Sequence, residues 1–175
     1  MSLTRSATRM GLTRTLAVRG LVPSRSIVGE IRNNLYRLMT EVATTLERHQ
    51  GDDGLALVAE MFRNLGREDA KSIKTRLGLG ETIRDALDAW LVVGRLMGAK
   101  IQPRWIGPDR VETDHPYCPQ HEIFVQSGRL FCESVCLPYV EALATGVAPE
   151  VEMEVVRPAT MERACTKALV IRRGE

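Results

Sequence analysis

Hydrophobic residues recur at helical spacing from about residue 31 to residue 97. Apolar side chains at intervals of three and four residues predict a helix of about five turns over residues 31–46. A second stripe predicts a helix over residues 55–65, after the turn that Gly51 begins. A third stripe predicts a helix that begins near Glu81 and continues to Met97. This part of the chain is therefore expected to be helical.

Alternation of apolar and polar residues replaces the helical spacing after Gly98. Residues 101–105 and 110–114 alternate on either side of "IGPDR", which predicts a β-hairpin. The segments that follow predict a strand, a helix and two last strands, over residues 122–125, 129–145, 151–156 and 167–171. Helices followed by a hairpin, a helix and a second hairpin predict an α+β fold with an antiparallel sheet and a helix between the hairpins.

The composition is typical of one globular domain that can bury its own core, with 175 residues, 44% of them hydrophobic and 26% charged. The first 29 residues differ from the rest, because they contain five arginines and no acidic residue. Such a segment is typical of an organellar transit peptide or of a basic arm that lies on a partner subunit, and we favour the arm. We therefore divide the chain into an N-terminal arm, residues 1–29, and a single α+β domain, residues 30–175.

The same features indicate the partners and the location to expect. The longest apolar runs, such as residues 89–93, are far shorter than the roughly 18 residues of a membrane span, so no membrane association is expected. The net charge is only +2 and the arm has no aromatic residue to stack on bases, which argues against nucleic acid as a partner. We expect a protein partner or a homo-oligomer held through the arm, and a cytoplasmic location, with the organellar matrix as the alternative.

Cysteine and histidine gather in residues 115–136, which hold three of the four cysteines and two of the three histidines. Cys132 and Cys136 are four residues apart on the predicted helix and can face the same side. Together with Cys118 and Cys165 they can form a tetrahedral zinc site. Free cysteine is also among the most buried residue types. The residues alone therefore leave three interpretations open: packed core thiols, structural zinc, and a reactive or ligand-binding thiol.

A reactive thiol needs a nearby base or positive charge that favours the thiolate. His115 and His121 lie three residues on either side of Cys118, and Asp114 or Glu122 can orient an imidazole ring. Cys118 with His115 is therefore a candidate catalytic pair. The sequence argues against other common reaction centres, since it contains no phosphate-binding glycine loop, no GxSxG elbow and no HExxH motif.

Four segments of the C-terminal half form a series: "PYCPQHEIF", "CESVCLPYVEAL", "VVRPATMERAC" and "CTKALVIR". In this series residues 114–172 resemble the L-2-amino-thiazoline-4-carboxylate hydrolase family. The positions that match the family pattern are Cys118, Cys136, Tyr139, Arg157, Thr160 and Cys165. The resemblance implies that Cys118 or Cys136 attacks the substrate or ligates a metal. It also implies that Arg157 binds a substrate carboxylate, with Tyr139 and Thr160 in the same substrate site.

The first functional hypothesis is therefore a hydrolase-like enzyme or enzyme subunit that acts on a small cyclic C–N substrate. The order of elements also resembles the 4-vinyl reductase domain, a small-molecule-binding module in which cysteines can hold zinc. The alternative hypothesis is a non-catalytic module that binds a small molecule or zinc and serves as a subunit of a larger assembly. A solvent-open pocket beside Cys118 and Arg157 would favour catalysis, and four cysteines around one ion would favour the binding module.

Overall fold

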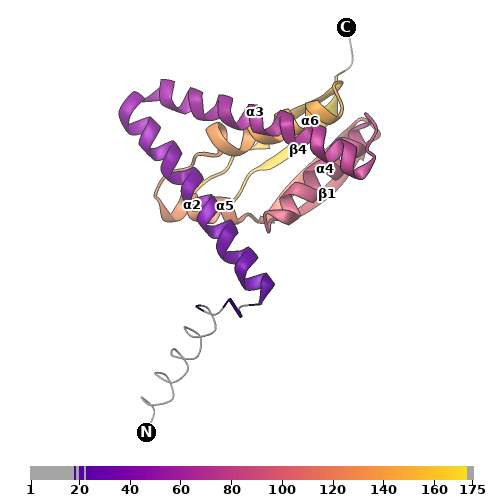
Figure 1. The fold of residues 1–175 in the computed structure, drawn as a ribbon. Coiled ribbons are helices and arrows are strands. Elements are labelled where there is room, and N and C mark those ends of the chain that lie inside the picture. Colours follow the sequence, from indigo (N-terminus) through magenta and orange to yellow (C-terminus); the bar gives the residue numbers. More distant parts are fainter. Residues whose placement is uncertain (1–17, 19, 22, 173–175) are drawn as a thin grey trace. The chain divides into compact units, whose positions relative to one another are not determined.

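The computed structural model describes residues 18, 20, 21 and 23–172, and the chain divides into two compact units, residues 1–35 and 36–175 (Figure 1). Most of the predicted arm, including residues 1–17, lies outside the described residues. Helix α2 (Ser24–Gln50) begins in the first unit, where it exposes Ile27, Val28, Ile31 and Leu35. The second unit begins at Tyr36, inside α2.

The second unit combines helices with a four-stranded sheet. Its helices after α2 are α3 (Asp52–Leu77), α4 (Ile83–Leu96), α5 (Pro119–Gln126), the π-helix η1 (Cys132–Cys136) and α6 (Leu137–Val147). Its strands are β1 (Lys100–Gly107), β2 (Arg110–Tyr117), β3 (Val151–Arg157) and β4 (Thr166–Ile171). The strands lie in the order β1-β2-β4-β3, and each neighbouring pair is antiparallel. The predicted α+β fold class is therefore confirmed.

Local sequence explains where several elements begin and end. Thr82 accepts a hydrogen bond from the Asp85 backbone N–H and donates its own N–H to the Asp85 carboxylate, and this capping box starts α4. Gly78 ends α3 with a φ of 63°, in the left-handed region that favours glycine. The predicted turn in "IGPDR" joins β1 to β2.

One predicted strand is wrong, because residues 122–125 lie in helix α5. Pro119 stands in the first turn of α5, where its fixed backbone angle suits a helix start. Proline lacks an N–H, and an N–H in this first turn would have no partner within the helix. The Glu122 N–H donates to the Cys118 carbonyl over 3.2 Å, which closes that first turn. Burial of His121 and Phe124, three residues apart, follows helical spacing and holds α5 against the core.

The helix predicted over residues 129–145 begins instead with the π-helix η1 and continues as α6. Pro138 has no N–H, so it cannot donate to the Ser134 carbonyl four residues back as an α-helix requires. The Leu137 N–H donates to the Cys132 carbonyl five residues back, which is the π-helical pattern. The widened turn carries both Cys132 and Cys136.

Two hydrophobic clusters hold the second unit together. The larger one packs α4 and α6 against the sheet and buries Trp90 and Leu169. The smaller one joins α2, α3, α5 and η1 and buries Phe62 and Phe131. Gly66 allows α3 to approach α6, since a Cβ at this position would lie 2.4 Å from the Tyr139 carbonyl oxygen.

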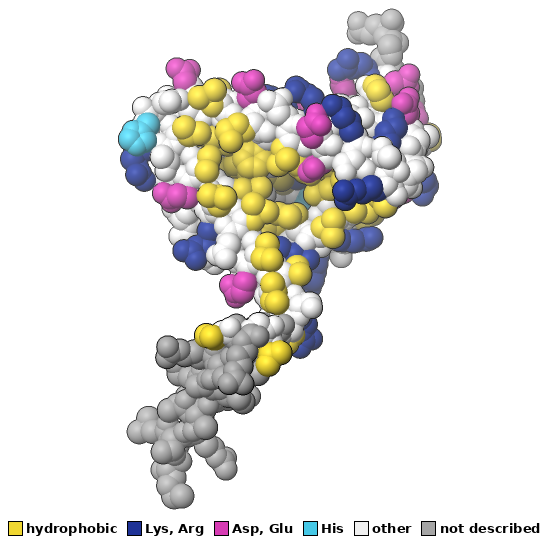
Figure 2. Space-filling model, in the orientation of Figure 1, with side chains coloured by type: hydrophobic (Ala, Val, Ile, Leu, Met, Phe, Trp, Pro, Cys, Tyr) yellow, Lys and Arg dark blue, Asp and Glu magenta, His cyan; other side chains and the backbone are white. Residues whose placement is uncertain are grey.

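Part of the apolar surface of the second unit stays exposed. Some of the exposed large apolar side chains are on α2 and α3, and we call the following ones the α2–α3 apolar face: Leu38, Leu57, Met61 and Leu65. Figure 2 shows hydrophobic side chains gathered where these two helices lie. Large exposed apolar patches typically mark contact surfaces. No helix among the described residues has the length and apolar character needed to cross a membrane.

Candidate functional site

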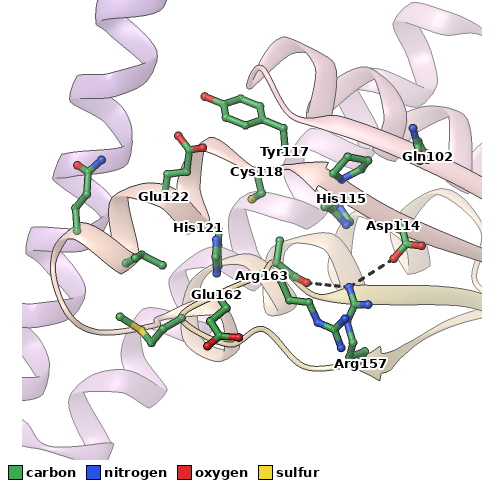
Figure 3. A pocket seen from close by; sticks show the side chains of 15 residues that line it. Gln102, Asp114, His115, Tyr117, Cys118, His121, Glu122, Arg157, Glu162 and Arg163 are labelled. Carbon is green, nitrogen blue, oxygen red and sulfur yellow. Dashed lines mark hydrogen bonds and ion pairs between the residues drawn. The ribbon is translucent and has the colours of Figure 1, made fainter.

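A pocket of about 650 Å³ opens between β2, α5 and the loop that joins β3 to β4. Three residues predicted from the sequence line it: His115, Cys118 and Arg157. Figure 3 shows Cys118 and His115 between Glu122 of α5 and the pair formed by Asp114 and Arg157. Five of the residues that line the pocket are charged: Asp114, Glu122, Glu162, Arg157 and Arg163.

Arg157 is held at the end of β3 by two partners. Its Nη2 donates to the Ala164 carbonyl over 3.1 Å and lies 3.6 Å from Asp114 Oδ1. The same Asp114 oxygen accepts a hydrogen bond of 2.5 Å from the Thr166 hydroxyl, which fixes the carboxylate. The side chain of Arg157 is 35% exposed, so the guanidinium is oriented by the protein and still reachable from the pocket.

The two histidines of the pocket tie the β3–β4 loop to the rest of the site. His115 Nδ1 lies 3.2 Å from the Cys165 carbonyl, and His121 Nε2 lies 2.6 Å from the Thr160 carbonyl. A carbonyl only accepts, so each of these ring nitrogens carries the proton. Both imidazoles therefore use their N–H groups to anchor the loop that carries Glu162 and Arg163.

Burial, together with the nearby positive charge of Lys167, lowers the pKa of His115 to about 3. The neutral imidazole packs against the Trp90 ring, with the two ring centres 5.9 Å apart. Burial raises the pKa of Cys118 to about 11, and negative charge at Cys136 adds to the rise. At neutral pH Cys118 is therefore a thiol and His115 is a weak base.

Behind the pocket, the four cysteines approach Lys167, and their charges affect one another's pKa. We call these five residues the thiol cluster: Cys118, Cys132, Cys136, Cys165 and Lys167. Lys167 on β4 is only 1% exposed. Its Nζ lies 3.5 Å from Cys136 Sγ and 5.1 Å from the centre of the Trp90 ring.

In the thiol cluster, burial and the nearby charged groups have opposite effects on the pKa of Lys167. Burial raises the pKa of both Cys132 and Cys165, which keeps these two groups as thiols at neutral pH. Burial by itself lowers the pKa of Lys167, but its interaction with the nearby cysteine sulfurs, most of all that of Cys136, raises it above the ordinary lysine value. Lys167 therefore stays an ammonium ion inside the protein.

The zinc site predicted for Cys118, Cys132, Cys136 and Cys165 finds no support in this geometry. Among the described residues, which include all four cysteines, no group of three or more His, Cys, Asp or Glu side chains is placed to hold a metal ion. The ammonium of Lys167 supplies positive charge close to the sulfurs. Metal binding stays a prediction from the sequence, and metal analysis of the purified protein would measure it.

Two predicted substrate-site residues lie outside the pocket lining. Tyr139 on α6 donates its hydroxyl to Asp69 Oδ2 on α3 over 2.6 Å, and it packs against both hydrophobic clusters. Thr160 is exposed, and its carbonyl accepts the hydrogen bond from His121. In this structure Tyr139 joins two helices and Thr160 holds the β3–β4 loop.

Lys167 is the central residue that the sequence analysis missed, since it counted only as the first residue of the last strand. A signal was present, because side chains two apart on a strand share a face. Lys167 therefore lies on the same face as Leu169, which is fully buried. A lysine on the buried face of a strand indicates a special environment.

Comparisons with protein-family models and with curated protein sequences gave no match. The fold is similar to that of solved structures. One is a trafficking protein particle complex subunit 3 from Naegleria fowleri covalently bound to palmitic acid, with a TM-score of 0.61 and 12% identity. That likeness covers 83% of this chain and 97% of the other.

A second similar structure is the phenol-responsive sensory domain of the transcription activator PoxR with phenol. Its TM-score is 0.57 at 14% identity, over 79% of this chain and 72% of the other. At this identity the likeness of both structures shows a shared fold and nothing about chemistry.

Proposed function

We propose that this chain is a non-catalytic module that binds a small, polar, carboxylate-bearing molecule. The guanidinium of Arg157 supports the proposal, because it stands in the pocket held by Asp114 and the Ala164 carbonyl. A guanidinium fixed in this way binds carboxylates with good geometry. Both similar structures carry a small organic molecule, palmitic acid in one and phenol in the other.

The lining indicates which part of the ligand goes where. Two arginines and three carboxylates in one pocket suit a ligand with charge or hydrogen-bonding capacity at both ends. A ligand carboxylate would meet Arg157, and a nitrogen-bearing end would meet Glu122 or Glu162. Such a lining disfavours a long acyl chain, because the chain would cover charged groups that now face water.

Hydrolysis is the second candidate function, since Cys118, His115 and Arg157 share the pocket. The ionisation of the first two disfavours it. With a pKa of about 11, Cys118 is a poor nucleophile at neutral pH. With a pKa of about 3, His115 is far from the range in which a general base works well. Binding without turnover is therefore the better-supported function.

The test uses L-2-amino-thiazoline-4-carboxylate, which has a carboxylate and a ring amidine. Titration calorimetry on the full chain would measure affinity, and mass spectrometry of the same samples would measure ring opening. We expect saturable binding without ring opening. Arg157→Gln is expected to weaken binding by roughly 10- to 100-fold, the usual contribution of a hydrogen bond between charged groups.

Arg172→Gln is the matched control, because Arg172 pairs with Glu152 outside the pocket lining. This change is expected to leave the affinity unchanged. Absence of saturable binding, or equal affinities for wild type and Arg157→Gln, would contradict the proposal. Catalytic ring opening would replace it with the hydrolase function.

We also propose that the chain associates with identical copies of itself through the α2–α3 apolar face. The α2–α3 apolar face exposes Leu38 by 60% and Met61 by 55%, and both signs of charge flank it, with Arg37 and Glu41 on α2. A face that has both signs can pair with its own copy, because an arginine of one copy then meets a glutamate of the other. The similar trafficking protein is itself named as a subunit of a complex.

A further inference from the structure

Buried Lys167 and partly exposed Cys136 form a pair that the proposed pocket function does not use. None of the carboxylates in the described part of the chain forms an ion pair with Lys167. Its ammonium lies 3.5 Å from Cys136 Sγ and 5.1 Å from the centre of the Trp90 ring, and it also forms a hydrogen bond with the side chain of Cys165. A buried ammonium is costly unless it has a negative or polarisable partner. The sulfurs of Cys136 and Cys165 are therefore the polarisable partners of Lys167, and Cys136 has the larger effect on its pKa.

Cys136 also lies on an unusual backbone, which it shares with Cys132. It is the last residue of the π-helix η1, which Pro138 forces open two residues later. Single π-helical turns inside α-helices are rare and occur frequently at functional sites. Cys136 is partly exposed, whereas Lys167 is fully enclosed. A small oxidant can therefore reach the sulfur while the amine stays shielded from water.

We propose that Cys136 is an oxidation site and that Lys167 traps the oxidised sulfur as a sulfur–nitrogen bond. Hydrogen peroxide is the oxidant. The reaction does not depend on the ligand binding proposed for the pocket. The Cys136 thiolate attacks one peroxide oxygen, the O–O bond breaks, and the sulfur becomes a sulfenic acid. The departing hydroxide takes a proton from the Lys167 ammonium and leaves as water.

The second step uses the amine that the first step releases. The neutral Lys167 nitrogen attacks the Cys136 sulfur, the S–O bond breaks, and the hydroxide leaves with a proton from nitrogen as a second water. The sum is one thiolate, one ammonium and one peroxide giving one sulfenamide and two waters, with two electrons passing from sulfur to peroxide. Sulfenic acids are known to condense with nitrogen in this way.

The surrounding thiols compete poorly for the sulfenic acid. Burial raises the pKa of Cys165 and Cys132, so both stay protonated and are weak nucleophiles at neutral pH. Cys118 is held as a thiol by the same cause. The amine 3.5 Å from Cys136 Sγ is the nucleophile already in position.

The experiment treats the full chain with one equivalent of hydrogen peroxide and maps its peptides without reductant. We expect a cross-link between the peptides that contain Cys136 and Lys167, with the mass of two hydrogens lost and thiol reductants restoring the starting mass. In Lys167→Met, an uncharged side chain of similar length, the sulfenic acid should persist and be labelled by dimedone. Oxidation of Cys136 should also become roughly tenfold slower or more, because the ammonium that lies 3.5 Å from its sulfur and gives the departing hydroxide a proton is missing.

Cys132→Ser is the matched control, since it removes a neighbouring thiol in the same π-helix and should leave the cross-link unchanged. Cys136→Ser should abolish it. A disulfide between Cys136 and another cysteine, or an unmodified Cys136, would overturn the proposal. The wild-type peptide map decides this even if a variant does not fold.

Discussion

At the scale of single residues, His115 lies in an environment that opposes its protonation from two sides. Burial removes the water that would stabilise an imidazolium, and the Lys167 ammonium adds repulsion. The Nδ1–H is already donated to the Cys165 carbonyl, which fixes the neutral tautomer. Protonation of His115 therefore couples directly to the stability of the fold.

The resulting pH dependence has a definite sign. Unfolded, His115 has the ordinary pKa of 6.5, and folded it has a pKa of about 3, so the unfolded state binds more protons between these values. The stability contributed by the neutral ring is complete above pH 6.5 and is lost as the pH falls toward 3. At about pH 5 the loss should be about 2 kcal/mol.

The test compares wild type with His115→Asn, whose amide can still donate to the Cys165 carbonyl but does not titrate. Chemical denaturation at about pH 7.5 and about pH 5 would give the free energy of unfolding of both proteins. The wild type should lose about 2 kcal/mol more than the variant over this range. Equal losses would show that His115 does not govern the pH response.

The sequence predicts a residue of this site where a reactive type of side chain lies in a loop or at the end of a strand. His115 and Cys118 were found in this way and Arg157 through the family resemblance, and all three line the pocket. Lys167 was missed, because whether a strand face is buried depends on what packs against it, here α4 with Trp90. Tyr139 matched a family pattern, and in this structure it joins α6 to Asp69.

At the scale of elements, the contact between α3 and α6 depends on one missing side chain. Gly66 lies in the middle of α3, where glycine is a poor helix former. It is compatible with the fold because α6 passes so close that a Cβ would lie 2.4 Å from the Tyr139 carbonyl oxygen and 3.2 Å from the Leu143 nitrogen. Backbone atoms on both sides leave little room for adjustment.

We expect Gly66→Ala to lower the free energy of unfolding by about 1–3 kcal/mol, the usual cost of overpacking, despite the better helix propensity of alanine. Gly29→Ala is the matched control, since that glycine is also in a helix and a Cβ there meets nothing within 4 Å. The control should be neutral or slightly more stable. If both changes have the same effect in thermal denaturation, close packing of α3 on α6 does not matter to stability.

The elements that sequence predicted well are those whose own pattern decides them. The capping box of Thr82 and Asp85 and the alternation around "IGPDR" are local signals, and α4 and the first hairpin follow them. The segment 122–125 was mistaken for a strand because a short apolar run fits either structure, and burial of Phe124 decided for a helix. The π-helix depends on Pro138, whose effect on an otherwise helical pattern was not considered.

At the scale of the whole molecule, the described part of residues 18–35 and the described residues after it differ in how much apolar surface they bury. Residues 36–175 form a compact unit with two hydrophobic clusters. The described part of the first unit leaves Ile27, Val28, Ile31 and Leu35 exposed. Ordering a residue costs roughly 1–2 kcal/mol in backbone entropy, so a segment that buries so little needs another surface to order it.

Deleting residues 1–28 should therefore weaken self-association and leave the second unit folded. Light scattering of the full chain and of the truncated chain would give their masses over a range of concentrations, and circular dichroism would confirm that the helices and the sheet remain.

Met61→Glu in the full chain should weaken the same assembly, because it places a charge on the α2–α3 apolar face. Glu133→Gln is a control on a different element, since this residue is exposed on η1. An oligomer that is unchanged by the deletion would refute the role of the arm, and a full chain that is monomeric throughout would refute assembly through either surface.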